Sequence, residues 1–302
     1  SKVTNDVASS MIKTHLDESL YNVSIGRYSN CRPSDLSSIF KHNPLTHIKR
    51  MLGKGDEQIF SILEERQPIL HIAAHMLLPS FSLLQSILGN KMILIDGKKA
   101  AAELRGELKQ EVSELKTKYN KVPGLTVILI GDMTPSQIYV RNKEKSANEV
   151  GLKSEVIKYP DTVKEKTVLE KIEELNKDKN ISGILVQLPL PDHISKEKII
   201  NAIDPFKDVD GFNPVNVGNL ASGYEAIIPC TPLGCLLLIK KVEKNLSGKH
   251  AVIVGRSNLN GKPMAQLLLK ENCTVTITHS KTKDLKGECL KADIIVAAVG
   301  IP

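Results

Sequence analysis

Hydrophobic positions follow two different patterns along the chain, and the change comes near residue 91. Before that point, apolar residues occur in helix-like pieces, without the alternation or short continuous runs that are typical of strands. After it, apolar runs of strand length alternate with segments in which apolar residues recur every three or four positions. We therefore predict a mostly helical or partly unstructured extension over residues 1–91 and an α/β region after it.

The most apolar stretch of the extension lies at residues 68–88. It is interrupted by His71, His75, Pro79 and several serines, so it lacks the clean run of about 20 apolar residues that a membrane span needs. A buried helical hairpin is the interpretation that we favour for this stretch. The opening residues do not show the basic-then-apolar pattern of a signal peptide, so we expect neither a signal peptide nor membrane association.

The first α/β series extends from residue 92 to residue 187. Its predicted strands are 92–96, 125–130, 154–158 and 183–187, and its predicted helices are 98–119, 134–150 and 162–176. The run 125–130 is almost entirely apolar, as in a strand that is covered on both faces. Thr134 and Pro135 predict a helix start, with Thr134 as the N-cap and Pro135 in the first turn.

A second series begins near residue 229. Thr231 and Pro232 predict the start of an apolar helix, which could bridge two lobes. Strands at 249–254, 274–279 and 293–298 and a helix at 263–271 follow. We predict a catalytic domain at 92–228 and a Rossmann-like domain at 229–302. Because a doubly wound domain normally has about six strands, we expect the second domain to be truncated, with an unpaired sheet edge at strand 293–298.

Charge and cysteine content narrow the function further. The chain of 302 residues has 41 Lys and Arg against 34 Asp and Glu, a net charge of +7. The two signs are mixed along the chain, which favours a solvated surface over a nucleic-acid site while still suiting a small anionic ligand. The 5 cysteines form no C-x-x-C pair, so we predict neither disulfides nor a metal site. This use of cysteine fits a reducing compartment, and we therefore predict a cytoplasmic location.

The segment after strand 249–254 is a candidate dinucleotide site. Gly255 ends the strand and Gly261 precedes a helix, which permits a tight turn and a helix N-terminus aimed at a phosphate. The spacing is not G-x-G-x-x-G, so a plain strand-turn-helix stays open. Arg256 could reach a phosphate, and Ser280 stands after the next strand, where an NAD site usually has an acid. These residues favour NADP.

A second group of candidate residues belongs to the first series. Tyr139 and Lys143 are four positions apart, so they share one face of a helix, where they could stack a flat ring and move a proton. A solvated basic face is the alternative. Gln187 ends strand 183–187 at an edge where α/β sites form. Asp208 and Asp210 precede Gly211, either as functional carboxylates or simply as part of a turn.

Taken together, these segments resemble the bifunctional methylenetetrahydrofolate dehydrogenase/methenyltetrahydrofolate cyclohydrolase family over residues 92–302. The resemblance implies a two-lobed α/β enzyme of one-carbon metabolism that binds tetrahydrofolate derivatives in a cleft, uses NADP and forms a homodimer. The segments that carry it are Tyr139-Val-Arg-Asn-Lys143-Glu-Lys145, Gly183-Ile-Leu-Val-Gln187-Leu-Pro-Leu-Pro191, Lys207-Asp-Val-Asp210-Gly-Phe212, Pro229-Cys-Thr-Pro-Leu-Gly234 and Val254-Gly-Arg-Ser-Asn258 followed by Gly261-Lys-Pro-Met264.

The resemblance also implies roles for single residues. Lys143 would be the catalytic general acid/base, Tyr139 would stack on the pterin, Gln187 would hydrogen-bond near Lys143, and Asp210 would anchor the pterin amino groups. Hydride transfer from the methylene bridge to the nicotinamide would precede addition of water to the methenyl carbon, with ring opening to the 10-formyl product. The implied NADP-binding residues are Gly255, Arg256, Ser257 and Ser280.

The chain departs from the family pattern in several places. Asn213 stands where the family commonly has His, and Asn260 replaces a small apolar residue in the cofactor turn. The carboxyl end of the family is missing and residues 1–91 are foreign to it, so we expect a fragment that is a poor enzyme. Two other functions stay open: another two-lobed NADP dehydrogenase, of the shikimate type, and a non-catalytic binding chain. The spacing of Tyr139 and Lys143, together with the segment that contains Gln187, argues against the shikimate-type dehydrogenase.

Overall fold

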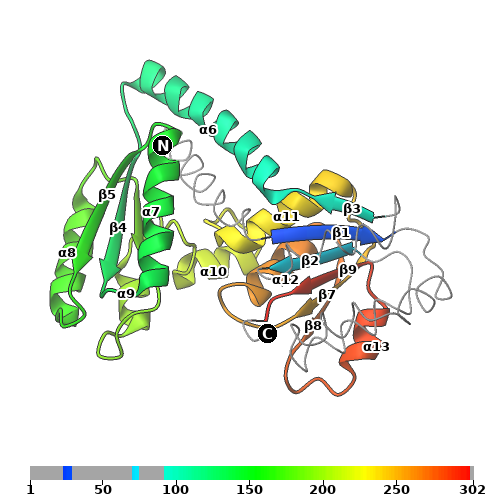
Figure 1. The fold of residues 1–302 in the computed structure, drawn as a ribbon. Helices are drawn as coiled ribbons and strands as arrows, with labels where there is room; N and C mark the ends of the chain where they lie inside the picture. The colour runs from blue at the N-terminus through cyan, green and yellow to red at the C-terminus, as the bar shows by residue number, and fades with distance from the viewer. Residues whose placement is uncertain (1–22, 29–69, 75–91, 300–302) are drawn as a thin grey trace. The chain divides into compact units, whose positions relative to one another are not determined.

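The computed structural model describes residues 23–28, 70–74 and 92–299, and they form an α/β structure (Figure 1). The described residues divide into two compact units. The first comprises residues 98–234, and the second comprises 23–28, 70–74, 92–97 and 235–299. The chain passes from the first unit to the second within helix α11 (Cys230–Val242). Among the helices described, none is both long enough and apolar enough to cross a membrane.

The first unit is built on a parallel sheet with strand order β5-β4-β6. Strand β4 (Gly124–Ile130) lies between β5 (Lys153–Tyr159) and β6 (Gly183–Val186), and every one of its residues is buried. Ile128 and Ile130 pack with helices α8 (Glu165–Lys177) and α9 (Lys196–Ala202), whereas Val127 and Leu129 face helices α6 (Gly97–Tyr119) and α7 (Thr134–Glu149). Helices therefore cover both faces of β4, as its apolar sequence predicts (Figure 1).

The segment after α9 extends this sheet beyond β6. Ile184 of β6 forms a parallel bridge with Asp208, and its backbone N–H donates to the carbonyl of Lys207 at 2.7 Å. On the other side of β6, the N–H of Gln187 donates to the carbonyl of Ile128 at 2.9 Å. Helix α10 (Pro214–Ala221) follows the extended segment. Strand β6 is thus held by β4 on one side and, near its amino end, by the strand-like residues near 208 on the other.

The second unit has the strand order β8-β7-β9-β2-β1-β3. Strands β8 (Thr274–Thr278), β7 (His250–Val254) and β9 (Ile294–Ala297) are parallel, and helices α12 (Gly261–Lys270) and α13 (Leu285–Leu290) connect them in the chain. Val252, Val254 and Ile295 pack with Cys289 and Ala292 in one buried cluster. Strand β2 (Leu70–Ala74) continues the sheet in parallel to β9, and β1 (Val23–Tyr28) and β3 (Met92–Ile95) follow in antiparallel pairing.

Two predictions about residues 1–91 are wrong where the structure describes them. Strands β1 and β2 occur in a segment for which we expected no strand, and β2 lies inside the stretch 68–88 that we interpreted as a helical hairpin. The expected unpaired edge at β9 is wrong as well, because β2 pairs with it. A free edge with unpaired backbone groups favours strand pairing over the local helix-like pattern. The rest of residues 1–91 lies outside the described residues.

The other elements end within a few residues of their predicted positions, and the errors have local causes. Helix α7 begins at Thr134, but its N-cap is Met133, without a side-chain cap hydrogen bond, so the predicted Thr134 cap is wrong. The short helices α9, α10 and α13 were not predicted. Their starts are held by hydrogen bonds from backbone N–H groups to the side chains of Ser195, Asn213 and Asp284. Helices this short show little hydrophobic periodicity.

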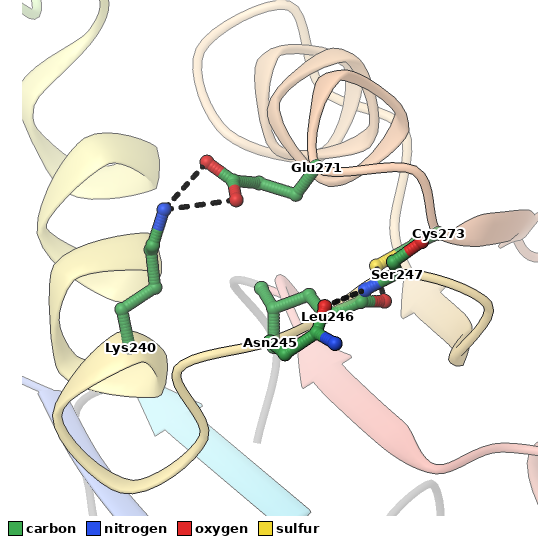
Figure 2. Close-up of polar contacts among 6 residues, drawn as sticks. All are labelled: Lys240, Asn245, Leu246, Ser247, Glu271 and Cys273. Atoms are coloured by element: carbon green, nitrogen blue, oxygen red, sulfur yellow. Dashed lines mark hydrogen bonds and ion pairs between the residues drawn. The ribbon is translucent and has the colours of Figure 1, made fainter.

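Polar contacts tie helix α11 to the end of α12 within the second unit. Figure 2 shows Lys240 of α11 reaching both carboxylate oxygens of Glu271, at 2.9 and 2.8 Å. The Sγ of Cys273 donates to the carbonyl of Leu246 at 3.4 Å, and burial raises the pKa of this thiol. The backbone segment that leads from α11 to β7 is therefore held against the start of β8.

Candidate active site

Lys143 and Gln187 are in direct contact in the first unit. Lys143, on helix α7, donates from Nζ to Oε1 of Gln187 at 3.2 Å. Gln187 follows β6 directly, and its Nε2 donates to the carbonyl of Leu188 at 2.8 Å, before the cis peptide bond between Leu188 and Pro189. Since the amide nitrogen is held by the backbone, the amide oxygen is the atom available to the lysine. The contact expected between Lys143 and Gln187 is therefore present.

Tyr139 lies one helical turn before Lys143 on α7. Its side chain is 39% exposed, whereas Val140 and Ala147 on the same helix are buried in the core. The helix is oriented by these buried positions, so the residues next to them, Tyr139 and Lys143, lie at the border between core and solvent. An aromatic ring and an amine at such a border are both accessible to a ligand with a flat heterocycle.

Asp208 and Asp210 have different surroundings. Asp208 is 2% exposed, while Asp210 is only partly buried. Oδ2 of Asp208 accepts from the backbone N–H of Asn213 at 2.7 Å and from Nδ2 of Asn216 at 3.2 Å. Burial raises the pKa of Asp208 to about 6, and the charge of Asp210 adds to the rise, while these hydrogen bonds act in the opposite direction. Asp210 is the carboxylate that a ligand can reach more easily.

The sequence analysis left Asp208 open as a functional carboxylate or part of a turn, without a specific role, and it treated Asn213 only as a departure from the family pattern. In the structure, Asn213 is buried and caps helix α10, because its Oδ1 accepts from the N–H of Val215 at 3.0 Å. Its Nδ2 donates to the carbonyl of Ile203 at 3.0 Å. The pair Asn213 and Pro214 is a helix-start signal that could have been found in the sequence. Nothing in the local pattern indicated the burial of Asp208.

The turn that carries Asp210 is fixed by the residues on either side of it. Gly211 has a φ of +66°, and a Cβ there would lie 2.5 Å from the carbonyl oxygen of Ile227, so this position requires glycine. Lys207 donates to three carbonyls, those of Leu175, Asn176 and Asp178. These carbonyls lie at the C-terminal end of α8, where a cation is favoured by the helix dipole. Partial burial lowers the pKa of Lys207.

The candidate cofactor turn lies in the second unit, between β7 and α12. Gly255 has a φ of +121°, and a Cβ on it would lie 2.3 Å from the carbonyl oxygen of Ala298. A Cβ on Gly261 would lie 2.2 Å from the carbonyl oxygen of Gly255. The Oγ of Ser257 accepts from the N–H groups of Asn260 and Gly261, at 3.1 and 3.4 Å. Both glycines are therefore required by close backbone approach, as expected for a phosphate-binding turn.

Arg256 and Ser280 lie at the same edge of the second sheet. β7 and β8 are parallel with Val254 opposite Thr278, and the N–H of Gly255 donates to the carbonyl of Thr278 at 2.8 Å. Arg256, Ser257 and Ser280 are exposed. A guanidinium and two hydroxyls at this sheet edge are the kinds of donor that a phosphate monoester needs. Across the described ranges, no cluster of three or more His, Cys, Asp or Glu side chains could hold a metal ion.

Comparison with known proteins identifies the two α/β series of the chain. Residues 95–210 match the family model of the tetrahydrofolate dehydrogenase/cyclohydrolase catalytic domain, and residues 229–302 match that of its NAD(P)-binding domain. The bifunctional protein FolD of Pelagibacter ubique is 80% identical over 211 residues, which cover 70% of this chain and 75% of that protein.

Solved structures give the same result. The bifunctional FolD enzyme of Campylobacter jejuni has a TM-score of 0.67 at 47% identity, covering 68% of this chain and 73% of that one. The Trypanosoma brucei methylenetetrahydrofolate dehydrogenase-cyclohydrolase, complexed with NADP and an inhibitor, has a TM-score of 0.64 at 35% identity, covering 68% and 70%. With both domain models matched in order, the chain belongs to the tetrahydrofolate dehydrogenase/cyclohydrolase family.

Proposed function

We propose that this chain oxidises 5,10-methylenetetrahydrofolate with NADP and hydrolyses the methenyl product, with Lys143 as general acid/base. The pair of activities follows from the family, whose catalytic and NAD(P)-binding domains are both matched. The assignment of residues rests chiefly on one observation, the hydrogen bond of 3.2 Å from Lys143 to Gln187 at the carboxyl end of β6. Carboxyl ends of parallel strands are where α/β proteins bind their ligands.

The hydrolytic half of the reaction gives Lys143 a defined task. Water adds to the cationic methenyl carbon, and the amine of Lys143 takes the proton that the water loses. The same proton then passes to the folate nitrogen whose bond to that carbon breaks. The hydroxyl on the carbon loses its own proton to solvent as that bond breaks, and it becomes the carbonyl of the 10-formyl product. Gln187 keeps Nζ in place by accepting one of its hydrogens. Tyr139 supplies a ring for stacking on the pterin, and Asp210 accepts hydrogen bonds from the pterin amino groups.

The turn between β7 and α12 fits the dinucleotide. The absence of a Cβ at Gly255 and Gly261 lets the turn pack closely against Ala298 and against its own backbone, and this tight turn leads directly into α12, whose N-terminus is suited to a phosphate. Arg256, with Ser257 and Ser280, is suited to the 2′-phosphate that distinguishes NADP from NAD. When bound, NADP supplies the acceptor for the hydride of the methylene group.

Substitution of Lys143 tests the proposal. Lys143→Met should lower the cyclohydrolase rate by about 10²- to 10⁴-fold, the usual contribution of a general acid/base, while NADP binding by calorimetry stays unchanged. Lys145→Met is the matched control, since Lys145 is an exposed lysine on the same helix. A near-normal rate in the Lys143 variant would contradict the assignment. A wild-type chain that binds NADP without turnover would instead support the non-catalytic alternative.

The homodimer and the cytoplasmic location stay predictions. A homodimer would have twice the chain mass of 33.2 kDa, which light scattering after gel filtration measures directly. Activity with a small hydroxy acid instead of the folate would favour the shikimate-type alternative. Measuring turnover by the wild-type chain also tests the expectation that this chain is a poor enzyme. One reason for that expectation was an unpaired sheet edge at β9, and in the structure β2 pairs with that edge.

A further inference from the structure

A buried carboxylate lies two residues before Asp210, and the proposed chemistry gives it no task. Asp208 is 2% exposed and belongs to the strand-like segment beside β6. Burying a carboxylate is costly unless hydrogen bonds compensate for the lost water. Here one oxygen, Oδ2, accepts both the N–H of Asn213 and the Nδ2 of Asn216. An apolar residue would fill such a position at lower cost if packing were its only purpose.

The partners of Asp208 connect it to the surrounding backbone. Asn216 also donates from Nδ2 to the carbonyl of Pro205 at 2.9 Å, and its Oδ1 accepts from the N–H of Ile227 at 3.2 Å. Asp208 closes the turn with its own carbonyl, which accepts from the N–H of Gly211 at 3.1 Å. Asp208, directly and through Asn216, therefore links the residues before the turn, the start of α10 and the segment at 227, and Asp210 lies within the turn that these links hold.

We propose that Asp208 is a positioning residue for folate binding, which holds the turn at 208–211 so that Asp210 stays where it can bind the pterin. The inference rests on the role of Asp210 in the proposed function. Asp208 acts through its two hydrogen bonds and does not touch the substrate. The bridge from Asp208 to Ile184 connects the same turn to β6, the strand that Gln187 follows. One backbone network thus sets the spacing between the residues that bind the pterin and those that hold Lys143.

Steady-state kinetics of the full chain test this role. Asp208→Ala removes both acceptor bonds and should raise the KM for methylenetetrahydrofolate by about tenfold or more, with the KM for NADP within about twofold of wild type. Asp208→Asn should restore the folate KM to within about threefold, because an amide oxygen can accept the same two N–H groups. Asp204→Ala is the matched control: Asp204 lies in the same loop, and its carboxylate accepts from the nearby N–H of Phe206 at 2.9 Å.

The outcomes separate this inference from the proposed function. If Asp210→Ala raises the folate KM but Asp208→Ala does not, Asp208 has no positioning role and the function of Asp210 stands. If Asp210→Ala leaves the folate KM unchanged, the pterin role fails and the inference fails with it. Equal rises in both KM values for Asp208→Ala would indicate a general structural defect and overturn the proposal. If that variant does not fold, Asn216→Ala, which removes one of the two donors, must still raise the folate KM selectively.

Discussion

Replacing Asp208 with asparagine removes an ionisable group from the interior of the first unit, so it should change the pH dependence of stability. Burial raises the pKa of Asp208 from 3.8 to about 6, with the negative charge of Asp210 contributing. A carboxyl whose pKa is higher in the folded protein keeps its proton more tightly there than in the unfolded chain. Its favourable contribution is fully present below about pH 4 and is lost as the pH rises through about 6.

The size of the effect follows from the two pKa values. They differ by about two pH units, and each unit corresponds to ~1.4 kcal/mol, so the wild-type chain should lose about 3 kcal/mol of unfolding free energy from this group. The loss falls between about pH 4 and pH 7. Asparagine has no such titration. The difference in stability between wild type and Asp208→Asn should therefore shift by about 3 kcal/mol in favour of the variant over that interval.

Urea unfolding, followed by far-UV circular dichroism at several pH values between 4 and 8, measures this difference. Glu170→Gln, at an exposed position of α8, is the control for removing one negative charge from the surface of the same unit. Its difference from wild type should change much less with pH. Parallel stability curves for wild type and Asp208→Asn would refute the reasoning, since they would mean that the carboxyl titrates alike in the folded and unfolded chains.

Three further predictions concern the cofactor turn and helix α8. Gly261→Ala should weaken NADP binding by at least about tenfold in calorimetry, because its Cβ would lie 2.2 Å from the carbonyl oxygen of Gly255 and the turn must move. The kcat/KM for NADP should exceed that for NAD by about ten- to a hundredfold, and Arg256→Ala should remove most of this preference. Lys207→Met should lower the unfolding free energy by about 1–3 kcal/mol in urea titrations, because three carbonyls at the end of α8 lose their donor.

Much of the site could be predicted because its residues are positioned by regular elements. The buried run of β4 and the periodic helix after it place Tyr139 and Lys143 near the strand ends, and Gln187 ends the neighbouring strand. Parallel pairing then brings Lys143 and Gln187 together without further information. The cofactor turn could be predicted for the same reason. The sequence shows a strand, a turn and a helix in succession, with Gly255 at the end of the strand and Gly261 at the start of the helix.

The parts that were missed depend on contacts between distant residues. Asp208 is buried because Asn216 and the segment at Ile227 close over it, and a local pattern does not show that closure. Strand β2 has a sequence that also suits a helix, and its pairing with β9 decides its conformation. Short helices such as α9 depend on a single cap, Ser195, instead of a long apolar face.

The pairing of β2 with β9 has a consequence for the order in which the chain can fold during synthesis. Leu70 lies opposite Ile294, and the whole of residues 98–234, which form the first unit, is made between them. Domains can fold as they leave the ribosome, amino-terminal part first. The first unit can therefore complete its core early, whereas β2 must wait for β9 to be synthesised. Closing so long a loop is slow, which makes the second unit the later step in the maturation of this protein.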